Sequence, residues 1–341
     1  MHPTLEKFCR LFQVPEFIAP WLDRFIQPTE IDLVLHLAAK PLTAAEITRK
    51  LDTLKKINSI EDLQGFLERC CKRGIIHQLE NGCYHAADFH TRYDVWALFE
   101  GWKDIPDDIR QQLNQWELAY YEDRHIAQIS ILKAGHSKDP ADTWPEYLLL
   151  HEAEALIDRV AQIYLWPCNC RSMVGECRQS VYTCLRFDND SGIGWQISKS
   201  RAKEIMHAAN KKGLMQSGEV AISADGSITG AVCNCCADCC FPHLLAARQN
   251  AEKLWPLSRY VARHLRERCI SCGRCAKRCP FGAFKAIKRQ KESGPKSKKL
   301  EIKYDRDLCR GCGICSTGCP EEAIEMEPLE VDSLVMRILE K

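Results

Sequence analysis

The sequence predicts an α+β chain with a mostly helical N-terminal part, a small cysteine-rich α+β middle and a C-terminal domain organised by cysteine motifs. Three observations support this fold class. Apolar residues recur at helical spacing in the N-terminal half. Asn-Gly and Asp-Gly turns separate short strand-like runs. The 21 cysteines of the 341-residue chain gather mainly in its second half. We expect four parts, residues 1–90, 91–166, 167–245 and 246–341.

The first part has the element order of a winged helix, three helices followed by a hairpin. Helical patterns cover residues 30–39, 43–51 and 59–73. Thr43 and Glu46 form a capping box at the start of the second helix, and Gly74 is a good residue to end the third. Asn81-Gly82 predicts a type I′ turn between two short strands.

The third helix of this module lacks the charge of a DNA-reading helix. Its acidic residues match its basic ones in number; they are Glu61, Asp62 and Glu68 against Arg69, Lys72 and Arg73. A nucleic-acid-binding surface needs a basic face, so we expect a protein-interaction or scaffolding module. Three cysteines of this part are interpreted as buried thiols, Cys70, Cys71 and Cys83.

Residues 91–166 are expected to form a mostly helical connector. Core packing explains its aromatic residues, and we assign them no further function. The histidines His125, His136 and His151 lack the spacing of metal ligands and are interpreted as structural.

The middle part holds nine cysteines in two groups. They are Cys168, Cys170, Cys177 and Cys184, then Cys233, Cys235, Cys236, Cys239 and Cys240. A helix over 198–212 and a hairpin through Asp225-Gly226 separate the groups and are expected to bring them together. Adjacent side chains point in different directions, so Cys235 and Cys236 are expected to serve different irons or different clusters.

So many neighbouring thiols predict a metal site, because metal-free thiols at this density are prone to oxidation. The favoured interpretation is one or two further iron–sulfur clusters. A larger unusual cluster, a zinc site and a metal-free redox-active thiol array stay open. Arg171 is predicted to donate a hydrogen bond to cluster sulfur; the alternative is a surface or salt-bridged arginine.

The C-terminal part carries two C-x2-C-x2-C-x3-C-P runs, the spacing of bacterial-type [4Fe-4S] ferredoxins. Three thiolates of each run reach one cube, and the fourth reaches the other. Cluster I is assigned to Cys269, Cys272, Cys275 and Cys319. Cluster II is assigned to Cys309, Cys312, Cys315 and Cys279. Gly273 and Gly313 are expected to relieve crowding in the tight loops. Zinc ligands or core thiols are the disfavoured alternatives.

Charge is unevenly distributed along the chain, although the net charge is only +1. Residues 241–303 carry 17 Lys and Arg against 4 Asp and Glu. Much of this charge lies in a basic insert between the cysteine runs, residues 285–303, which we expect to be a mobile surface loop. Such a loop offers a docking surface for an acidic redox partner; simple solvation and nucleic-acid binding are the alternatives.

Neither a leader nor an apolar run long enough for a membrane span is evident. We therefore expect a soluble, cytoplasmic protein whose grouped cysteines are metal ligands in a reducing compartment.

Together these motifs resemble a family of large dicluster [4Fe-4S] ferredoxin-like proteins of anaerobic microbes. The resemblance rests on a winged-helix-like N-terminus, a C-x-C-R segment beginning at Cys168, the C-N-C-C run at Cys233 and the two ferredoxin motifs. It implies electron transfer, as a subunit or partner of a larger oxidoreductase. The tail Cys239-Cys240-Phe241-Pro242 departs from the family, because another cysteine is expected in this dense group.

Three functions are compatible with the sequence. We favour a non-catalytic electron carrier or oxidoreductase subunit that relays low-potential electrons through its clusters. The alternatives are a reductase whose central cluster is the active site, and a redox-responsive winged-helix regulator that binds DNA. No P-loop, dinucleotide fingerprint or nucleophilic triad stands out, and we predict no catalytic residue.

Overall fold

The computed structural model describes residues 2–50, 60–135, 143–187, 193–288 and 300–340. The chain divides into two compact units, each described here by itself. The first comprises residues 1–117 and 190–193, and the second comprises residues 118–189 and 194–341. Helices and strands are mixed throughout, in agreement with the predicted α+β class. No described helix combines the length and apolar character needed to cross a bilayer.

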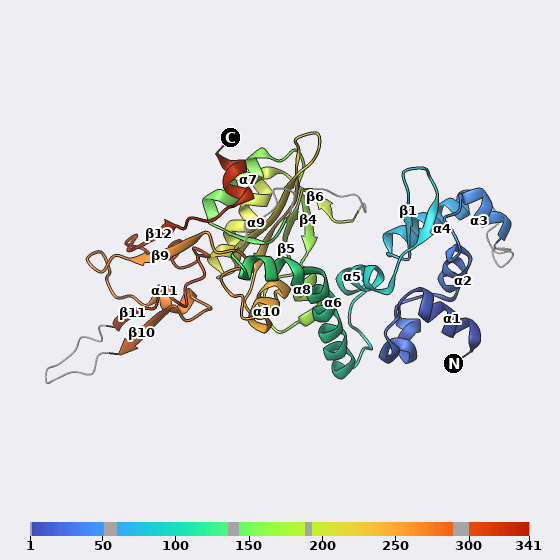
Figure 1. The fold of residues 1–341 in the computed structure, drawn as a ribbon, viewed down its shortest axis with the longest axis horizontal. Coiled ribbons are helices and arrows are strands. Elements are labelled where there is room, and N and C mark those ends of the chain that lie inside the picture. Colours follow the sequence, from blue (N-terminus) through green and yellow to red (C-terminus); the bar gives the residue numbers. More distant parts are fainter. Residues whose placement is uncertain (1, 51–59, 136–142, 188–192, 289–299, 341) are drawn as a thin grey trace. The chain divides into compact units, whose positions relative to one another are not determined.

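The first unit is mostly helical, with one small hairpin (Figure 1). Its elements are α1 (Pro3–Leu11), the 3-10 helix η1 (Glu16–Arg24), α2 (Pro28–Leu37), α3 (Ala44–Lys50), α4 (Ile60–Lys72), β1 (Ile76–Gln78), β2 (Tyr84–Ala86), α5 (Phe89–Phe99) and the start of α6 (Asp107–Lys133). The expected capping box is present: Thr43 N–H donates to Glu46 Oε2 at 2.8 Å. Gly74 follows α4 with a φ of +71°. The three helices and hairpin are therefore found, and the winged-helix assignment stays a prediction.

The turn between β1 and β2 differs from the predicted type I′ turn. A type I′ turn needs positive φ at both central residues, whereas Gly82 has a φ of +77° and Asn81 is not in that region. The Gly82 N–H donates to Leu79 O at 2.9 Å, and the Cys83 N–H donates to Asn81 Oδ1 at 3.0 Å. The loop is a tight turn closed by a left-handed glycine, because the asparagine side chain stabilises the backbone without leaving the ordinary φ range.

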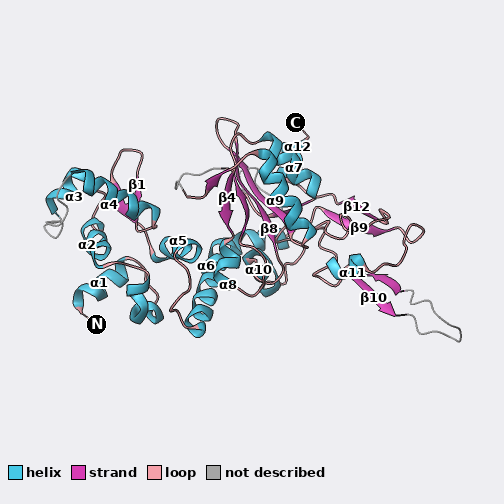
Figure 2. Cartoon of the chain, turned by 180° about the vertical axis from the view of Figure 1, so that it is seen from behind, coloured by secondary structure: helices cyan, strands magenta, loops and turns pink. Residues whose placement is uncertain are grey.

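The second unit is organised by a six-stranded antiparallel sheet of order β3-β7-β8-β5-β4-β6 (Figures 1 and 2). Its strands are β3 (Glu146–Leu148), β4 (Tyr164–Pro167), β5 (Tyr182–Arg186), β6 (Trp195–Gln196), β7 (Met215–Ile222) and β8 (Ile228–Cys235). The edge strand β3 comes from the expected helical connector, so the sheet extends beyond the cysteine-rich part. The predicted hairpin through Asp225-Gly226 is confirmed as β7–β8.

One face of the sheet is covered by three helices, α7 (Leu150–Arg159), α9 (Lys199–Lys211) and α12 (Leu334–Leu339). Leu185 and Val232 pair across β5 and β8 and lie in the core beneath these helices. The predicted helix 198–212 is confirmed as α9, which Ser198 caps by accepting from Arg201 N–H at 3.1 Å. Two short helices carry cysteines at or beside their starts, α8 (Asn169–Val174) and α10 (Phe241–Arg248).

The C-terminal segment contains two small antiparallel ribbons. Strand β9 (Tyr260–His264) pairs with β12 (Ile324–Pro328), and β10 (Phe284–Lys288) pairs with β11 (Leu300–Tyr304). Along the sequence, the helix α11 (Arg274–Arg278) lies between β9 and β10. The prediction of a surface loop over 285–303 is therefore wrong at both ends of this range, where the residues belong to the paired strands β10 and β11. Its middle, residues 289–299, lies outside the described residues.

A buried arginine joins the C-terminal segment to the sheet. Arg259, next to β9, is 0 % exposed and donates to Glu152 Oε1 at 3.0 Å and to Tyr147 O at 3.0 Å through Nη1 and Nε. Its Nε also lies 3.3 Å from Glu146 Oε2. Removing one member of a buried charge network leaves the others without compensation.

Replacing Arg259 with methionine should therefore destabilise the protein by about 3–5 kcal/mol. Arg263→Met is the matched control, because the Arg263 side chain is 53 % exposed and pairs with acidic residues at the surface. Arg263→Met should lower the free energy of unfolding by at most about 1 kcal/mol. Anaerobic urea unfolding measures both, and equal shifts of the two unfolding midpoints would contradict a structural role for the buried network.

Candidate metal centres

The first three cysteines of the first ferredoxin motif lie close to the last cysteine of the second motif. Cys269 and Cys272 lie in the loop after β9, and Cys275 lies on α11. Cys319 lies just before β12, the partner strand of β9. One cavity is lined by all four sulfur-bearing side chains, Cys269, Cys272, Cys275 and Cys319. The pairing of β9 with β12 explains this meeting, because it brings the two ends of the ferredoxin segment together.

The second quartet shows the complementary arrangement. Cys309, Cys312 and Cys315 are buried, and Cys279 from the first motif is half-buried. Burial, together with the neighbouring Cys279 and Cys309, raises the pKa of Cys312 to about 12. Likewise, burial chiefly raises the pKa of Cys275 to about 11, with a contribution from Cys319. Thiolates gathered in this way repel one another unless a cation lies among them, and thiolate is the donor that iron–sulfur clusters use.

Backbone N–H groups point at several of these sulfurs. Ser271 N–H donates to Cys269 Sγ at 3.4 Å, and Ala323 N–H donates to Cys319 Sγ at 3.2 Å. Ala262 N–H, on β9, donates to Cys309 Sγ at 3.4 Å. Such donors stabilise negative charge on cluster sulfur and shift its potential.

Glycines allow the motif loops to fold tightly. Gly273 and Gly313 have φ of +76° and +70°, which confirms the expected need for glycine. Gly311 was missed by the sequence reasoning although its constraint is severe. Its φ is +67°, and a Cβ there would lie 2.0 Å from the backbone oxygen of Tyr260. The second motif therefore packs directly against β9 at this glycine.

Arg278, between the third and fourth cysteines of the first motif, joins three parts of the second unit. Its Nε donates to Ile314 O at 2.7 Å, inside the second motif. Its Nη2 donates to Asn210 O at 2.8 Å and its Nη1 to Lys211 O at 3.1 Å, at the end of α9. A cation at a helix C-terminus is favourable because the last carbonyls lack helical partners.

Arg278→Ala should lower the free energy of unfolding by about 2–3 kcal/mol, because three carbonyls lose a charged donor. Lys277→Ala provides the control, since Lys277 is exposed on the same helix, and should change it by less than about 0.5 kcal/mol. Anaerobic thermal unfolding of both variants checks this. If Lys277→Ala destabilised the protein as much as Arg278→Ala, the loss of stability would come from changing the helix surface and not from losing the hydrogen bonds of Arg278.

The sheet brings six of the nine central cysteines together. Residues alternate between the two faces of a strand. Leu185 and Val232 pair and face the helix core, so their neighbours Cys184 on β5 and Cys233 on β8 lie on the opposite face. Cys168 follows β4, whose strand pairs with β5. The other three members are Cys170 on α8, Cys235 at the end of β8 and Cys240 before α10.

Thiol–thiol hydrogen bonds join these six side chains in a closed ring, in the order Cys168, Cys170, Cys240, Cys235, Cys233 and Cys184. Hydrogen bonds from Cys170 and Cys184 hold the pKa of Cys168 well below its usual value. Hydrogen bonds from Cys184 and Cys235 lower the pKa of Cys233 in the same way. In the other four members, Cys170, Cys184, Cys235 and Cys240, hydrogen bonds to neighbouring thiols and burial raise the pKa well above its usual value, so two of the six sulfurs favour the deprotonated form that binds metals.

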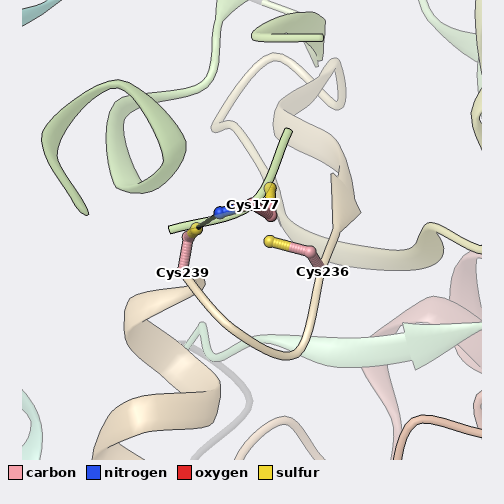
Figure 3. Close-up of side chains that lie close together, drawn as sticks. All are labelled: Cys177, Cys236 and Cys239. Atoms are coloured by element: carbon pink, nitrogen blue, oxygen red, sulfur yellow. Dashed lines mark hydrogen bonds between the residues drawn. The ribbon is translucent and has the colours of Figure 1, made fainter. Parts of the chain in front are cut away.

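The remaining three cysteines form a separate, tighter group. The Sγ atoms of Cys177, Cys236 and Cys239 all lie within 4.8 Å of one another. Figure 3 shows them converging from the loop after α8 and from the loop between β8 and α10. Cys177 N–H also donates to Cys239 Sγ at 3.3 Å. Cys235 belongs to the ring and Cys236 to this group, so the two side chains lie in different groups, and their binding to different irons or clusters stays a prediction.

Arg171 lies beside this group and is not a surface residue. It is 2 % exposed and donates to Thr183 Oγ1 at 3.0 Å and to Asn234 O at 2.7 Å. A hydrogen bond to Cys236 and the charges of nearby thiols raise the pKa of Arg171 against the opposing effect of burial. The surface alternative is therefore wrong, and the guanidinium is placed to compensate thiolate charge.

A buried Tyr–His pair, missed by the sequence reasoning, lies between the second quartet and the central cysteines. His243 Nε2 lies 3.0 Å from Tyr147 Oη, and its Nδ1 lies 3.1 Å from Cys236 O. Burial lowers the pKa of His243 to about 4, so the imidazole is neutral near pH 7. Tyr147 packs in one apolar cluster with Cys312 and Met215.

Within the described residues of the first unit, His90, Asp94 and Glu117 form a further grouping of possible ligands. Its contacts account for it without a metal, because His90 Nδ1 lies 3.0 Å from Glu117 Oε2. Cys70 is buried, and burial raises its pKa, as expected for a core thiol. The same expectation is wrong for Cys71 and Cys83, which are half-buried. Among the connector histidines, His125 Nδ1 lies 3.0 Å from Gln128 Oε1, His151 is exposed, and His136 lies outside the described residues.

Comparison with protein families finds one match in the C-terminal segment. Residues 262–326 match a family described as 4Fe-4S dicluster domain. All eight cysteines of the two ferredoxin motifs lie in this range, whereas the central cysteines and the N-terminal unit lie outside it. A search of curated proteins finds no match. The C-terminus therefore carries a 4Fe-4S dicluster domain, which supports an iron–sulfur electron-transfer role.

Proposed function

We propose that this protein relays low-potential electrons to or from a partner oxidoreductase and acts in the cytoplasm as a carrier or subunit. Cluster I is held by Cys269, Cys272, Cys275 and Cys319. Cluster II is held by Cys309, Cys312, Cys315 and Cys279. The observation that carries the proposal is the common cavity, where Cys319 joins the three cysteines of the other motif.

The donor set fits two [4Fe-4S] clusters, because each quartet supplies four sulfurs and backbone donors aimed at them. Clusters bound there supply one-electron redox centres. The protein's own task is to exclude water and compensate charge. Exposure differs between the quartets: Cys272 is exposed, whereas three members of the second quartet are buried. Electrons are therefore expected to exchange with the partner on the Cys272 side.

A basic ribbon lies next to this exposed cysteine. Gly273 follows Cys272, and a Cβ there would lie 2.9 Å from Leu300 Cδ1 on β11. On the same ribbon Lys285 is paired in register with Lys303. Like charges opposite each other are unfavourable for folding, so their presence favours an external acidic group. We infer that an acidic surface of the partner docks on the β10–β11 ribbon.

Charged small oxidants test this surface without the partner. The dithionite-reduced protein should reduce anionic tris(oxalato)cobaltate(III) faster than cationic hexaamminecobalt(III). Each rate is first divided by the rate at which an uncharged reduced flavin reduces the same oxidant, which removes the difference in intrinsic reactivity. In Lys285→Glu/Lys303→Glu this preference should fall at least about tenfold at low ionic strength and much less at high salt. Stopped-flow absorbance measures the rates.

The control variant is Lys7→Glu/Lys50→Glu, which makes the same change of net charge at exposed residues of the first unit. Its preference should match that of the unmodified protein. A reduced chain that transfers no electrons to either oxidant would contradict the carrier function. An equal loss of preference in both double variants would contradict the ribbon as the docking surface and leave the carrier function standing.

We further propose that the six-cysteine ring holds an additional iron–sulfur cluster in line with cluster II. Six thiols gathered at one face of the sheet, four of them buried (Cys168, Cys184, Cys235 and Cys240), suit a thiolate-bound cluster better than any other cofactor. Met215 and Cys312 lie in one apolar cluster, and Met215 is paired in register with Cys235 of the ring, which supports a relay between the two sites. Cys233→Ala should lower the iron content without changing the ferredoxin signals in electron paramagnetic resonance spectra.

A further inference from the structure

The group of Cys177, Cys236 and Cys239 is more compact than the ferredoxin quartets. Its three sulfurs lie within 4.8 Å of one another. Among the described residues the ferredoxin sulfurs form no group this tight, although they have the [4Fe-4S] spacing. A cubane attaches each thiolate to a different iron and so spreads its ligands. The three-cysteine group therefore has the dimensions of a site for a single ion.

We propose that Cys177, Cys236 and Cys239 bind one zinc ion through three thiolates, separately from the iron–sulfur clusters, with the fourth position open to water or a small exogenous ligand. Zn–S bonds of about 2.3 Å in a tetrahedral site place sulfurs about 3.8 Å apart, within the observed range. Cys236 and Cys239 also have the C-x2-C spacing of zinc sites.

The surroundings supply the charge that such a site needs. Three thiolates and Zn²⁺ carry a net charge of −1, which the buried Arg171 guanidinium compensates. Arg171 Nε has no hydrogen-bond partner among the described residues, although it is buried.

Coordination by three residues distinguishes this site from a closed structural one. Within the described part of the chain, no fourth His, Cys, Asp or Glu donor joins the group. Structural zinc sites have four protein ligands, whereas sites with three protein ligands keep a position for water or substrate. Ala209, Leu214 and Val174 pack around the sulfurs and limit access of solvent.

Zinc-edge X-ray absorption of the anaerobically purified full chain tests the proposal, because the signal is specific for zinc in the presence of iron. We expect about one zinc per chain with three sulfurs at about 2.3 Å and one oxygen or nitrogen. Four sulfurs bound to the zinc would contradict the proposal that its fourth coordination position is open. Absence of zinc, together with a Cys236–Cys239 disulfide or with iron bound by these residues, would overturn the site.

Two variants assign the ligands. Cys236→Ala and, as a less buried alternative, Cys177→Ala should each lose the zinc while keeping the iron content unchanged. Cys83→Ala is the control, because Cys83 lies in the first unit and outside the group; it should retain zinc. Loss of about four irons instead of zinc would show that the three thiols hold a cubane. The zinc and iron counts are independent, so failure of this site leaves the electron-transfer proposal unaffected.

Discussion

Cys319→Ala should remove about four irons per chain, and combining it with Cys272→Ala should remove no more. The expected result follows from crossed ligation, since both residues would hold the same cluster although they belong to different motifs. Combining Cys319→Ala with Cys312→Ala should instead remove about eight irons, because Cys312 would hold the other cluster. Iron analysis of the three variants after anaerobic purification measures the losses.

The reverse pattern would contradict the crossed assignment. If each motif held its own cluster, the pair Cys319 and Cys312 would lose about four irons and the pair Cys319 and Cys272 about eight. Cys9→Ala serves as the control, because Cys9 lies on α1 in the first unit. It should leave the iron content unchanged.

Gly311→Ala is expected to disrupt the second motif. The added Cβ would lie 2.0 Å from Tyr260 O, a backbone atom that moves only if β9 moves. The positive φ of +67° adds about 1–2 kcal/mol of strain for any residue with a side chain. We expect a total cost of about 4 kcal/mol or more and loss of iron from cluster II. Thermal unfolding and iron analysis check both effects.

Gly282→Ala separates the steric effect from the backbone strain. Gly282 has nearly the same φ, +70°, but a Cβ there would meet only the Lys285 Cε atom at 3.8 Å. Its variant should lose about 1–2 kcal/mol and keep its iron. Equal destabilisation of the two variants would mean that backbone strain, and not the contact with β9, governs this position.

Local sequence patterns predicted the regular elements well. Capping residues and glycines bounded α3, α4 and α9 because helix ends need partners for free backbone groups. The predicted type I′ turn at Asn81-Gly82 was wrong because several types of tight turn accept the same dipeptide. The basic insert was misjudged at its ends, where pairing between β10 and β11 outweighs a composition typical of loops.

The sequence predicted the candidate ligands but not their grouping in the central part. Spacing along a chain is informative when ligands share one loop, as Cys269, Cys272 and Cys275 do. Cys177 and Cys236 meet only because the sheet brings distant loops together. Arg171 likewise required tertiary structure, since its burial depends on acceptors in other segments such as Asn234.

The most direct test of an iron–sulfur electron-transfer protein is an iron and acid-labile sulfide count on the full chain purified without oxygen. Two [4Fe-4S] clusters require at least about eight of each per chain, and the six-cysteine ring should raise the count to about twelve or more. A count near eight would restrict the clusters to the C-terminal domain. Iron without matching sulfide, or neither, would contradict the proposed function.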